Sequence, residues 1–242
     1  MKGHPSPFAA SLVAIAALGF SATPVLVPDF AGFRPDQFPV PQADPPVQPA
    51  GYAFAIWGVI YAWLLIGAGF GLVMRAGAVD WHPMRPALAL SLAVGAAWLP
   101  VATLSPVGAT VLIWIMLVSA LMALERAPVL DRWWGRAPVA LYAGWLTAAA
   151  SVSIGLLLAG YGLTGPVVAA VIALLLALGL ALWVLRRLPD IAEYGVAVVW
   201  ALAAIAVANL AQSGLVTLLA LAGLAGVGWV TYRESRTRPA TA

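Results

Sequence analysis

Eight long stretches of the chain carry no charged side chain, and this pattern constrains the fold more than any other feature. They are residues 8–27, 52–74, 86–105, 107–124, 138–159, 165–185, 194–211 and 214–232. A helix that crosses the hydrocarbon core of a bilayer needs about 20 apolar residues. Only 9% of the residues are charged, whereas a soluble domain carries about 25%. We therefore predict an all-α fold, a polytopic membrane helix bundle of about eight transmembrane helices.

The basic residues predict the orientation of these helices. With eight crossings, both ends of the chain lie on one side of the membrane. Eleven basic residues share that side: Lys2, Arg75, Arg85, Arg126, Arg132, Arg136, Arg186, Arg187, Arg233, Arg236 and Arg238. Only Arg34 falls on the other side. Cytoplasmic loops carry an excess of Lys and Arg, so we predict a multi-pass protein of the cell (inner) membrane with both termini in the cytoplasm. Because the basic residues form no run, nucleic acid is not an expected partner.

The first segment, residues 1–27, has two interpretations. Lys2, the apolar run and the small residues of FSAT at 20–23 match a cleavable signal peptide. The apolar run continues through Val27, which is the length of a membrane span. We therefore predict a helix that is retained in the mature protein.

A proline-rich loop at residues 28–51 is the longest connection between the predicted spans. It holds seven prolines and a net charge of −2, from three aspartates against Arg34. Proline removes backbone donors and favours extended conformations, so we expect this loop to be non-helical. A long extended loop on the outer face could be a lid over a cavity or a simple spacer.

Chemically reactive side chains are missing from the predicted spans. None of the eight contains Asp, Glu, Lys, Arg or His, which disfavours ion-coupled pumping and acid–base catalysis within the membrane. The chain has no cysteine, and His4 and His82 lie outside the spans, so no metal site is expected. Asp190 and Glu193 lie at a span edge beside two arginines, and we expect them to be solvated.

The tryptophans fall into two groups by their position in the spans. Those near span ends are expected to be interfacial anchors, namely Trp81, Trp133, Trp134, Trp183 and Trp229. Those about two turns inside a span need a partner for the indole N–H or a polar cavity, namely Trp57, Trp98, Trp114, Trp145 and Trp200.

Two aromatic stripes involve the second group of tryptophans. Phe54, Trp57 and Tyr61 are spaced i, i+3 and i+7, so they share one face of the second span. Tyr142 and Trp145 form a similar stripe on the fifth span. Such stripes are usually helix–helix packing, and the alternative is the wall of a ligand pocket.

Three motifs in order along the chain resemble the tryptophan-rich sensory protein family (TspO/MBR, the translocator protein family). PPVQPAGYAFAIWGVIYAWLLIGAG at 45–69 is similar to the family's proline-rich loop and the following helix with Phe, Trp and Tyr. LAVGAAWLP at 92–100 resembles its third helix. PVALYAGWLTAAASVSIG at 138–155 resembles its Pro-Tyr-x-x-Trp segment.

The resemblance implies a five-helix part at residues 1–160, with the outer loop 28–51, and a three-helix C-terminal extension with a short basic tail at 161–242. Family members bind porphyrins, sterols or related hydrophobic molecules in a pocket under the first loop. The positions that match or adjoin this aromatic set are Phe54, Trp57, Tyr61, Trp98, Tyr142 and Trp145. A tetrapyrrole would be held by stacking and shape, because the spans offer no axial metal ligand.

The chain departs from the family pattern at several of these positions. Gly95 and Ser153 stand where asparagine is usual, and Leu141 stands where proline is usual. Ile154 replaces a second pocket tryptophan that some members carry. These departures weaken the case for a tetrapyrrole site but leave a hydrophobic pocket intact.

The function that we expect is non-catalytic binding of a hydrophobic small molecule, with a sensory, regulatory or translocator role and no cofactor. One alternative is a facilitative permease or exporter of a neutral or amphipathic solute. Another is an enzyme that degrades the bound pigment. The expected partners are the lipid bilayer and the ligand. A G-x-x-x-G pair at Gly67 and Gly71 suits close helix contact, and a homodimer is left open.

Overall fold

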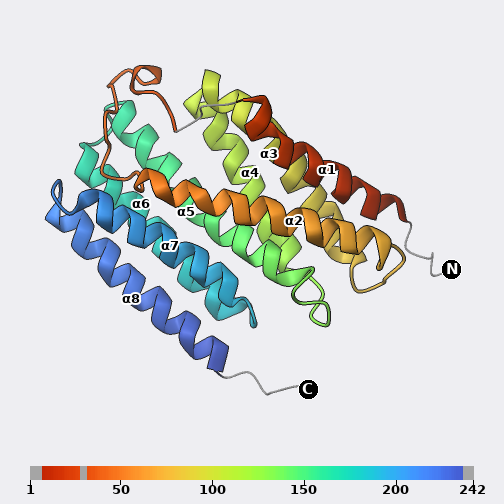
Figure 1. Cartoon of the computed structure of the whole chain (residues 1–242). Coiled ribbons are helices and arrows are strands. Elements are labelled where there is room, and N and C mark those ends of the chain that lie inside the picture. The colour runs from red at the N-terminus through yellow and green to blue at the C-terminus, as the bar shows by residue number, and fades with distance from the viewer. Residues whose placement is uncertain (1–6, 28–31, 237–242) are drawn as a thin grey trace.

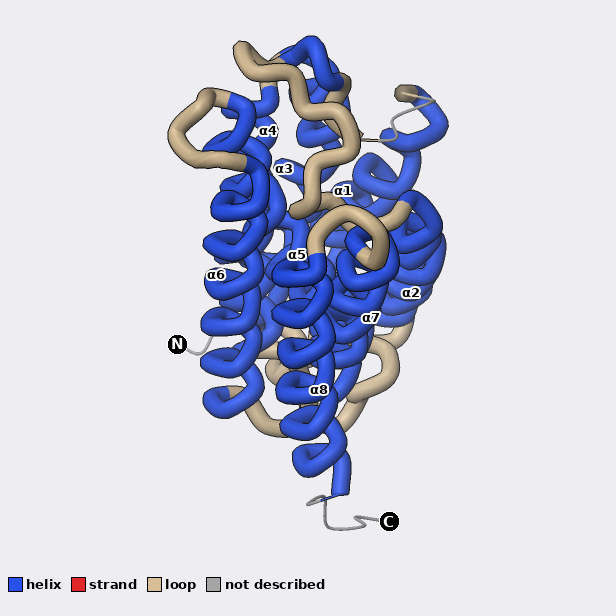
Figure 2. Tube along the Cα trace, turned by 90° about the vertical axis from the view of Figure 1, so that its left-hand side faces the viewer, coloured by secondary structure: helices blue, strands red, loops and turns tan. Residues whose placement is uncertain are grey.

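Eight helices run along a common axis in the computed structural model, which describes residues 7–27 and 32–236 (Figures 1 and 2). They are α1 (Pro7–Leu26), α2 (Ile56–Val73), α3 (Arg85–Leu104), α4 (Pro106–Glu125), α5 (Arg136–Gly160), α6 (Pro166–Arg187), α7 (Ala192–Asn209) and α8 (Gly214–Arg236). Short 3₁₀ helices are η1 (Pro35–Gln37), η2 (Gly51–Ala55) and η3 (His82–Met84). All eight long helices are long and apolar enough to cross a membrane. The predicted all-α membrane bundle is confirmed.

Helix α5 is the centre of the bundle. In the apolar stretch of α5, 72% of the residues are buried, whereas the corresponding share is 56% or less in each of the other helices. It packs against α2, α4, α6 and α7, while α1 lies on α2 and α3, and α8 lies on α6 and α7 (Figures 1 and 2). The three C-terminal helices therefore pack against the rest of the bundle mainly through α5, and α7 also contacts η2.

Small and hydroxylated residues allow α5 to be surrounded in this way. Gly144 packs directly on the backbone of Tyr194 in α7, where any side chain would collide. Thr147 donates to the carbonyl of Ala143 within α5, and its hydroxyl lies 2.8 Å from the hydroxyl of Tyr194. Small residues allow close backbone approach between membrane helices, and hydroxyl groups hydrogen bond across them.

The G-x-x-x-G pair of α2 is used inside the protomer. A Cβ at Gly67 would overlap the backbone carbonyl of Trp134, and a Cβ at Gly71 would lie 2.8 Å from the indole of Trp81. Both glycines are buried. The close contact predicted for this motif is therefore made with the segments that precede α3 and α5.

The two ends of the bundle differ in character. The start of α1 and the end of α8 lie at one end, here called the terminal end, and the proline-rich loop lies at the other, here called the loop end (Figure 1). Every basic residue of the described chain except Arg34 lies at the terminal end.

Two predictions for the terminal end are wrong. Asp190 and Glu193 are not simply solvated, because Arg132 contacts them at 3.0 and 2.8 Å and all three side chains are largely buried. Trp81 is not an interfacial anchor, because it is only 2% exposed and its indole N–H donates to Asp131 at 2.8 Å. In both cases a charged partner distant in the sequence takes the place of water.

The proline-rich loop crosses the loop end from α3 to α7. As predicted it is non-helical over residues 32–50, apart from the single turn of η1; residues 28–31 lie outside the described part of the chain. Four hydrogen bonds anchor its described residues, namely Gln37 Nε2 to the Ala102 carbonyl (3.0 Å), Val40 N to the Gly160 carbonyl (2.8 Å), Asn209 Nδ2 to the Pro46 carbonyl (2.8 Å) and Ala50 N to the Ala204 carbonyl (3.2 Å). The loop is therefore tied to helices on both sides of the bundle.

Candidate ligand-binding site

A cavity of about 80 Å³ lies beneath the proline-rich loop. Its lining comes from the loop, η2, α2, α3, α4, α5 and α7, namely Gly32, Phe33, Gln48, Pro49, Phe54, Trp57, Trp98, Ala109, Ile113, Trp145, Ala148, Ala149, Val152, Ser153, Leu156, Ala201 and Ile205. We call this space the loop-end cavity. No ionisable side chain is among these described lining residues.

Four of the six predicted site residues line the loop-end cavity: Phe54, Trp57, Trp98 and Trp145. The ring of Trp145 meets the rings of Phe54 and Trp57 edge-on, with centroids 6.1 Å apart in each pair. Phe54 belongs to the 3₁₀ helix η2 and not to α2. Rings from separate helices thus converge on one space, as the sequence predicts.

The other two predicted residues, Tyr61 and Tyr142, do not line the cavity. They lie one turn deeper, where Phe20 of α1 packs between them with centroid distances of 5.0 and 5.6 Å. Tyr61 also stacks on Trp57 at 5.3 Å, and the hydroxyl of Tyr142 lies 3.0 Å from that of Ser91. These tyrosines form an aromatic layer beneath the cavity, so they support its floor.

Helix α7 forms part of the wall, which the sequence did not predict. Ala201 and Ile205 line the cavity, and the indole N–H of Trp200 donates to the carbonyl of Ala53 at 3.0 Å. Alanine and isoleucine on an apolar span carry no signal for a site. The position of Trp200, about two turns inside its span, indicated only that its indole N–H needs a partner, and that partner lies in η2, directly before α2.

The positions that depart from the family pattern have different surroundings. A side chain at Gly95 would meet the ring of Phe20 at 2.7 Å, so asparagine does not fit here. Ser153 lines the loop-end cavity, whereas Ile154 lines a groove on the outside of α3, α4 and α5. Leu141 is buried in the core.

Two polar side chains of the cavity wall donate to backbone carbonyls. The indole N–H of Trp98 donates to the Ala109 carbonyl at 2.9 Å, and the hydroxyl of Ser153 donates to the Ala150 carbonyl at 2.7 Å. The indole N–H of Trp145 has no hydrogen-bond partner in the described chain. No group of three or more potential metal ligands occurs in the described residues.

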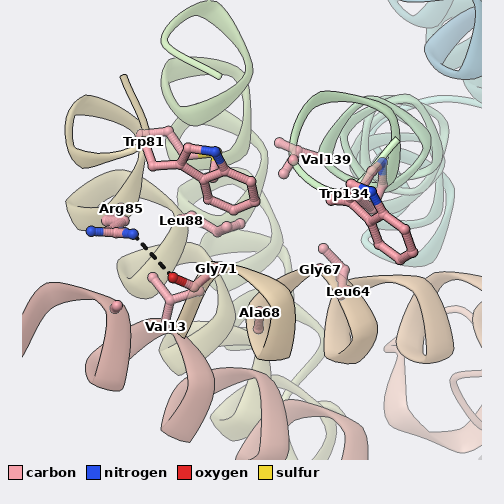
Figure 3. A pocket seen from close by; sticks show the side chains of 14 residues that line it. Val13, Leu64, Gly67, Ala68, Gly71, Trp81, Arg85, Leu88, Trp134 and Val139 are labelled. Atoms are coloured by element: carbon pink, nitrogen blue, oxygen red, sulfur yellow. Dashed lines mark hydrogen bonds between the residues drawn. The ribbon is translucent and has the colours of Figure 1, made fainter. Parts of the chain in front are cut away.

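A second and smaller cavity, of about 20 Å³, lies at the terminal end (Figure 3). Its walls come from α1, α2, α3 and α5, with Trp81 and Trp134 facing α2. The buried guanidinium of Arg85 donates to the carbonyls of Gly71 (3.2 Å), in the last turn of α2, and of Ala76 (2.7 Å), just beyond the helix. Arg85 therefore caps the end of α2, and its Nη1 and Nη2 both donate to backbone carbonyls.

A family model described as TSPO-like protein matches residues 41–232, well over half of the chain. The chain belongs to the TSPO-like protein family. No curated protein and no solved structure matches it. The TSPO-like match begins in the loop and runs through α8, so it includes both the cavity wall and the C-terminal helices. The division of the chain at residue 160 stays a prediction.

Membership of the TSPO-like family indicates a membrane protein with a ligand-binding or transport role. The family is generally non-enzymatic. Family membership and the eight apolar helices together identify the chain as a multi-pass membrane protein.

Proposed function

We propose that this TSPO-like protein binds a hydrophobic small molecule, porphyrin- or sterol-like, in the loop-end cavity, and acts as a sensor, regulator or translocator without catalysing a reaction. The observation that carries the proposal is the convergence of Phe54, Trp57, Trp98 and Trp145 on one cavity under the loop. Aromatic faces with few polar groups suit a flat apolar ligand.

The size of the cavity shows what a large ligand would require. Sites for drug-sized ligands enclose roughly 300–1,000 Å³, whereas this one encloses about 80 Å³. A tetrapyrrole therefore needs the loop to move. Four hydrogen bonds anchor the loop to α3, α5 and α7. At about 0.5–1.5 kcal/mol net for each bond, releasing all four costs about 2–6 kcal/mol, which ring stacking on a large ligand can offset.

Fluorescence quenching tests this proposal. Protoporphyrin IX should quench the tryptophan emission of the detergent-solubilised protein saturably. Trp57→Ala and Trp145→Ala should each shift the quenching midpoint to higher porphyrin concentration, because each removes a ring from the cavity wall. Trp229→Ala is the matched control, since Trp229 is 61% exposed near the end of α8. An unchanged midpoint in both cavity variants would show that the site is elsewhere.

A facilitative permease or exporter for a neutral or amphipathic solute is the second candidate. The two cavities favour it, because both are lined by α2, α3 and α5, and the layer of Phe20, Tyr61 and Tyr142 lies between them. Rotation of these rings would connect the cavities along the bundle axis. Proteoliposomes should then take up a neutral solute faster than empty vesicles, and Phe20→Ala should increase the rate. Equal uptake by both kinds of vesicle would argue against transport.

We also propose that both termini face the cytoplasm of the cell membrane. The support is the gathering of basic side chains at the terminal end, opposite Arg34. A C-terminal fusion to green fluorescent protein should fluoresce, while a fusion to alkaline phosphatase should be inactive. The reverse pattern would place the terminal end outside.

A further inference from the structure

The indole N–H of Trp145 is an unpaired donor in the wall of the loop-end cavity. Trp145 is only 2% exposed, and its Nε1 has no hydrogen-bond partner within the described residues. Buried donors in folded proteins are almost always paired, and each exception calls for an explanation. An indole N–H can donate but cannot accept, so its missing partner has to be an acceptor.

The rest of the cavity wall restricts the chemistry of that acceptor. The donors of Trp98 and Ser153 are used by backbone carbonyls. The carboxamide of Gln48, on the loop side, makes no side-chain hydrogen bond to any described residue, and it can donate or accept. None of the described residues that line the cavity is a cation that could balance a carboxylate or phosphate, and burying an unpaired charge is strongly unfavourable.

We infer, resting on the binding function proposed above, that the part of the ligand inside the cavity is an uncharged aromatic body carrying a carbonyl or similar neutral acceptor. This acceptor takes the hydrogen bond of the Trp145 N–H. The rings of Phe54 and Trp57, which stand edge-on to Trp145, pack against the apolar remainder of the ligand. A second polar group on the ligand would meet Gln48 under the loop.

Three naphthalenes of similar size separate these requirements: 1-acetonaphthone is a neutral ketone, 1-ethylnaphthalene is a hydrocarbon, and 1-naphthoate is an anion. Equilibrium dialysis of the solubilised protein against protein-free micelles gives the affinity for each. The ketone should bind about five- to tenfold more tightly than the hydrocarbon, the range expected for one hydrogen bond. The anion should bind no better than the hydrocarbon.

Trp145→Phe removes the N–H and keeps an aromatic ring. It should reduce the preference for the ketone to less than about twofold while leaving the affinity for the hydrocarbon nearly unchanged. Trp114→Phe is the matched control, because the Trp114 N–H is also buried and unpaired in the described chain but lines the external groove. This control should keep the full preference for the ketone.

The outcomes separate the inference from the function on which it rests. Equal binding of ketone and hydrocarbon would refute the hydrogen bond between the Trp145 N–H and an acceptor on the ligand. A preference for the ketone that survives Trp145→Phe would refute it as well. Neither result would contradict the binding function. If 1-naphthoate binds most tightly of the three, the part of the ligand inside the cavity is not required to be uncharged, and that part of the inference is wrong. If none of the three compounds binds saturably while protoporphyrin IX still quenches the tryptophan emission, the inference about the ligand fails and the binding function stands. If protoporphyrin IX also fails to quench, the proposed binding function is wrong, and the inference fails with it.

Discussion

Replacing Gly67 by alanine should destabilise the folded protomer, because the added methyl group has no space. Its Cβ would overlap the backbone carbonyl of Trp134 and lie 3.5 Å from the ring of Pro138. A side chain in the way can rotate, but this carbonyl belongs to the backbone before α5, so α2 has to move outward (Figure 3). Overpacking typically costs about 1–3 kcal/mol, and a fixed backbone obstacle places this case at about 2–3 kcal/mol.

Gly69→Ala is the control on the same helix. Gly69 is exposed, and a methyl group added there would meet no atom within 4 Å, so this variant should unfold at the temperature of the unmodified protein or slightly above it. Thermal unfolding in detergent, followed by circular dichroism, should show Gly67→Ala lower by roughly 5–10 °C.

The same pair of variants distinguishes two uses of the G-x-x-x-G motif. If Gly67 served contact between two copies of the chain, Gly67→Ala would alter the oligomeric state seen by light scattering and leave the stability of the protomer unchanged. That result, or equal unfolding temperatures for Gly67→Ala and Gly69→Ala, would refute the packing that we describe.

Three further predictions concern other contacts. The hydrogen bond from Arg75 lowers the pKa of the Asp131 carboxyl in the folded protein. The ionised carboxyl therefore stabilises the fold fully above its unfolded pKa of about 4, and this stabilisation is lost as the pH falls through the lower pKa of the folded state. Unfolding temperatures measured against pH should show this loss on the acid side, and Asp131→Asn should lack it. Trp200→Phe removes the hydrogen bond to Ala53 in η2 and should weaken protoporphyrin IX quenching severalfold, about the effect of one hydrogen bond. An unchanged quenching midpoint would show that this contact of α7 is dispensable to the site. Gly95→Asn should lower the unfolding temperature because the new side chain collides with Phe20. Adding Phe20→Ala should restore part of this loss. If the losses of the two single variants simply add in the double variant, the collision is not the cause.

The number and position of the spans could be predicted because hydropathy and charge act residue by residue along the chain. The convergence of Trp57, Trp98 and Trp145 was foreseen from their inward positions and from the family resemblance. The roles of Trp81 and Asp131 were not, because a tryptophan near a span end looks the same whether it meets lipid or a carboxylate 50 residues away.

The wall formed by α7 could not be predicted from the sequence, for a related reason. Ala201 and Ile205 are ordinary residues of an apolar span, and only the packing of α7 on α5 brings them to the cavity. Tyr61 and Tyr142 were expected to line the site, but Phe20 of α1 fills the space between them. Contacts between spans distant in sequence decide such details.

Protection of introduced cysteines by a ligand tests most directly whether the space under the loop is a binding site. The chain contains no cysteine, so Ala149→Cys in the cavity wall and Ala211→Cys in the exposed turn after α7 each provide one reactive thiol. Protoporphyrin IX should slow the reaction of an apolar methanethiosulfonate with Ala149→Cys and leave Ala211→Cys unaffected. Identical rates at Ala149→Cys with and without saturating porphyrin would contradict the account.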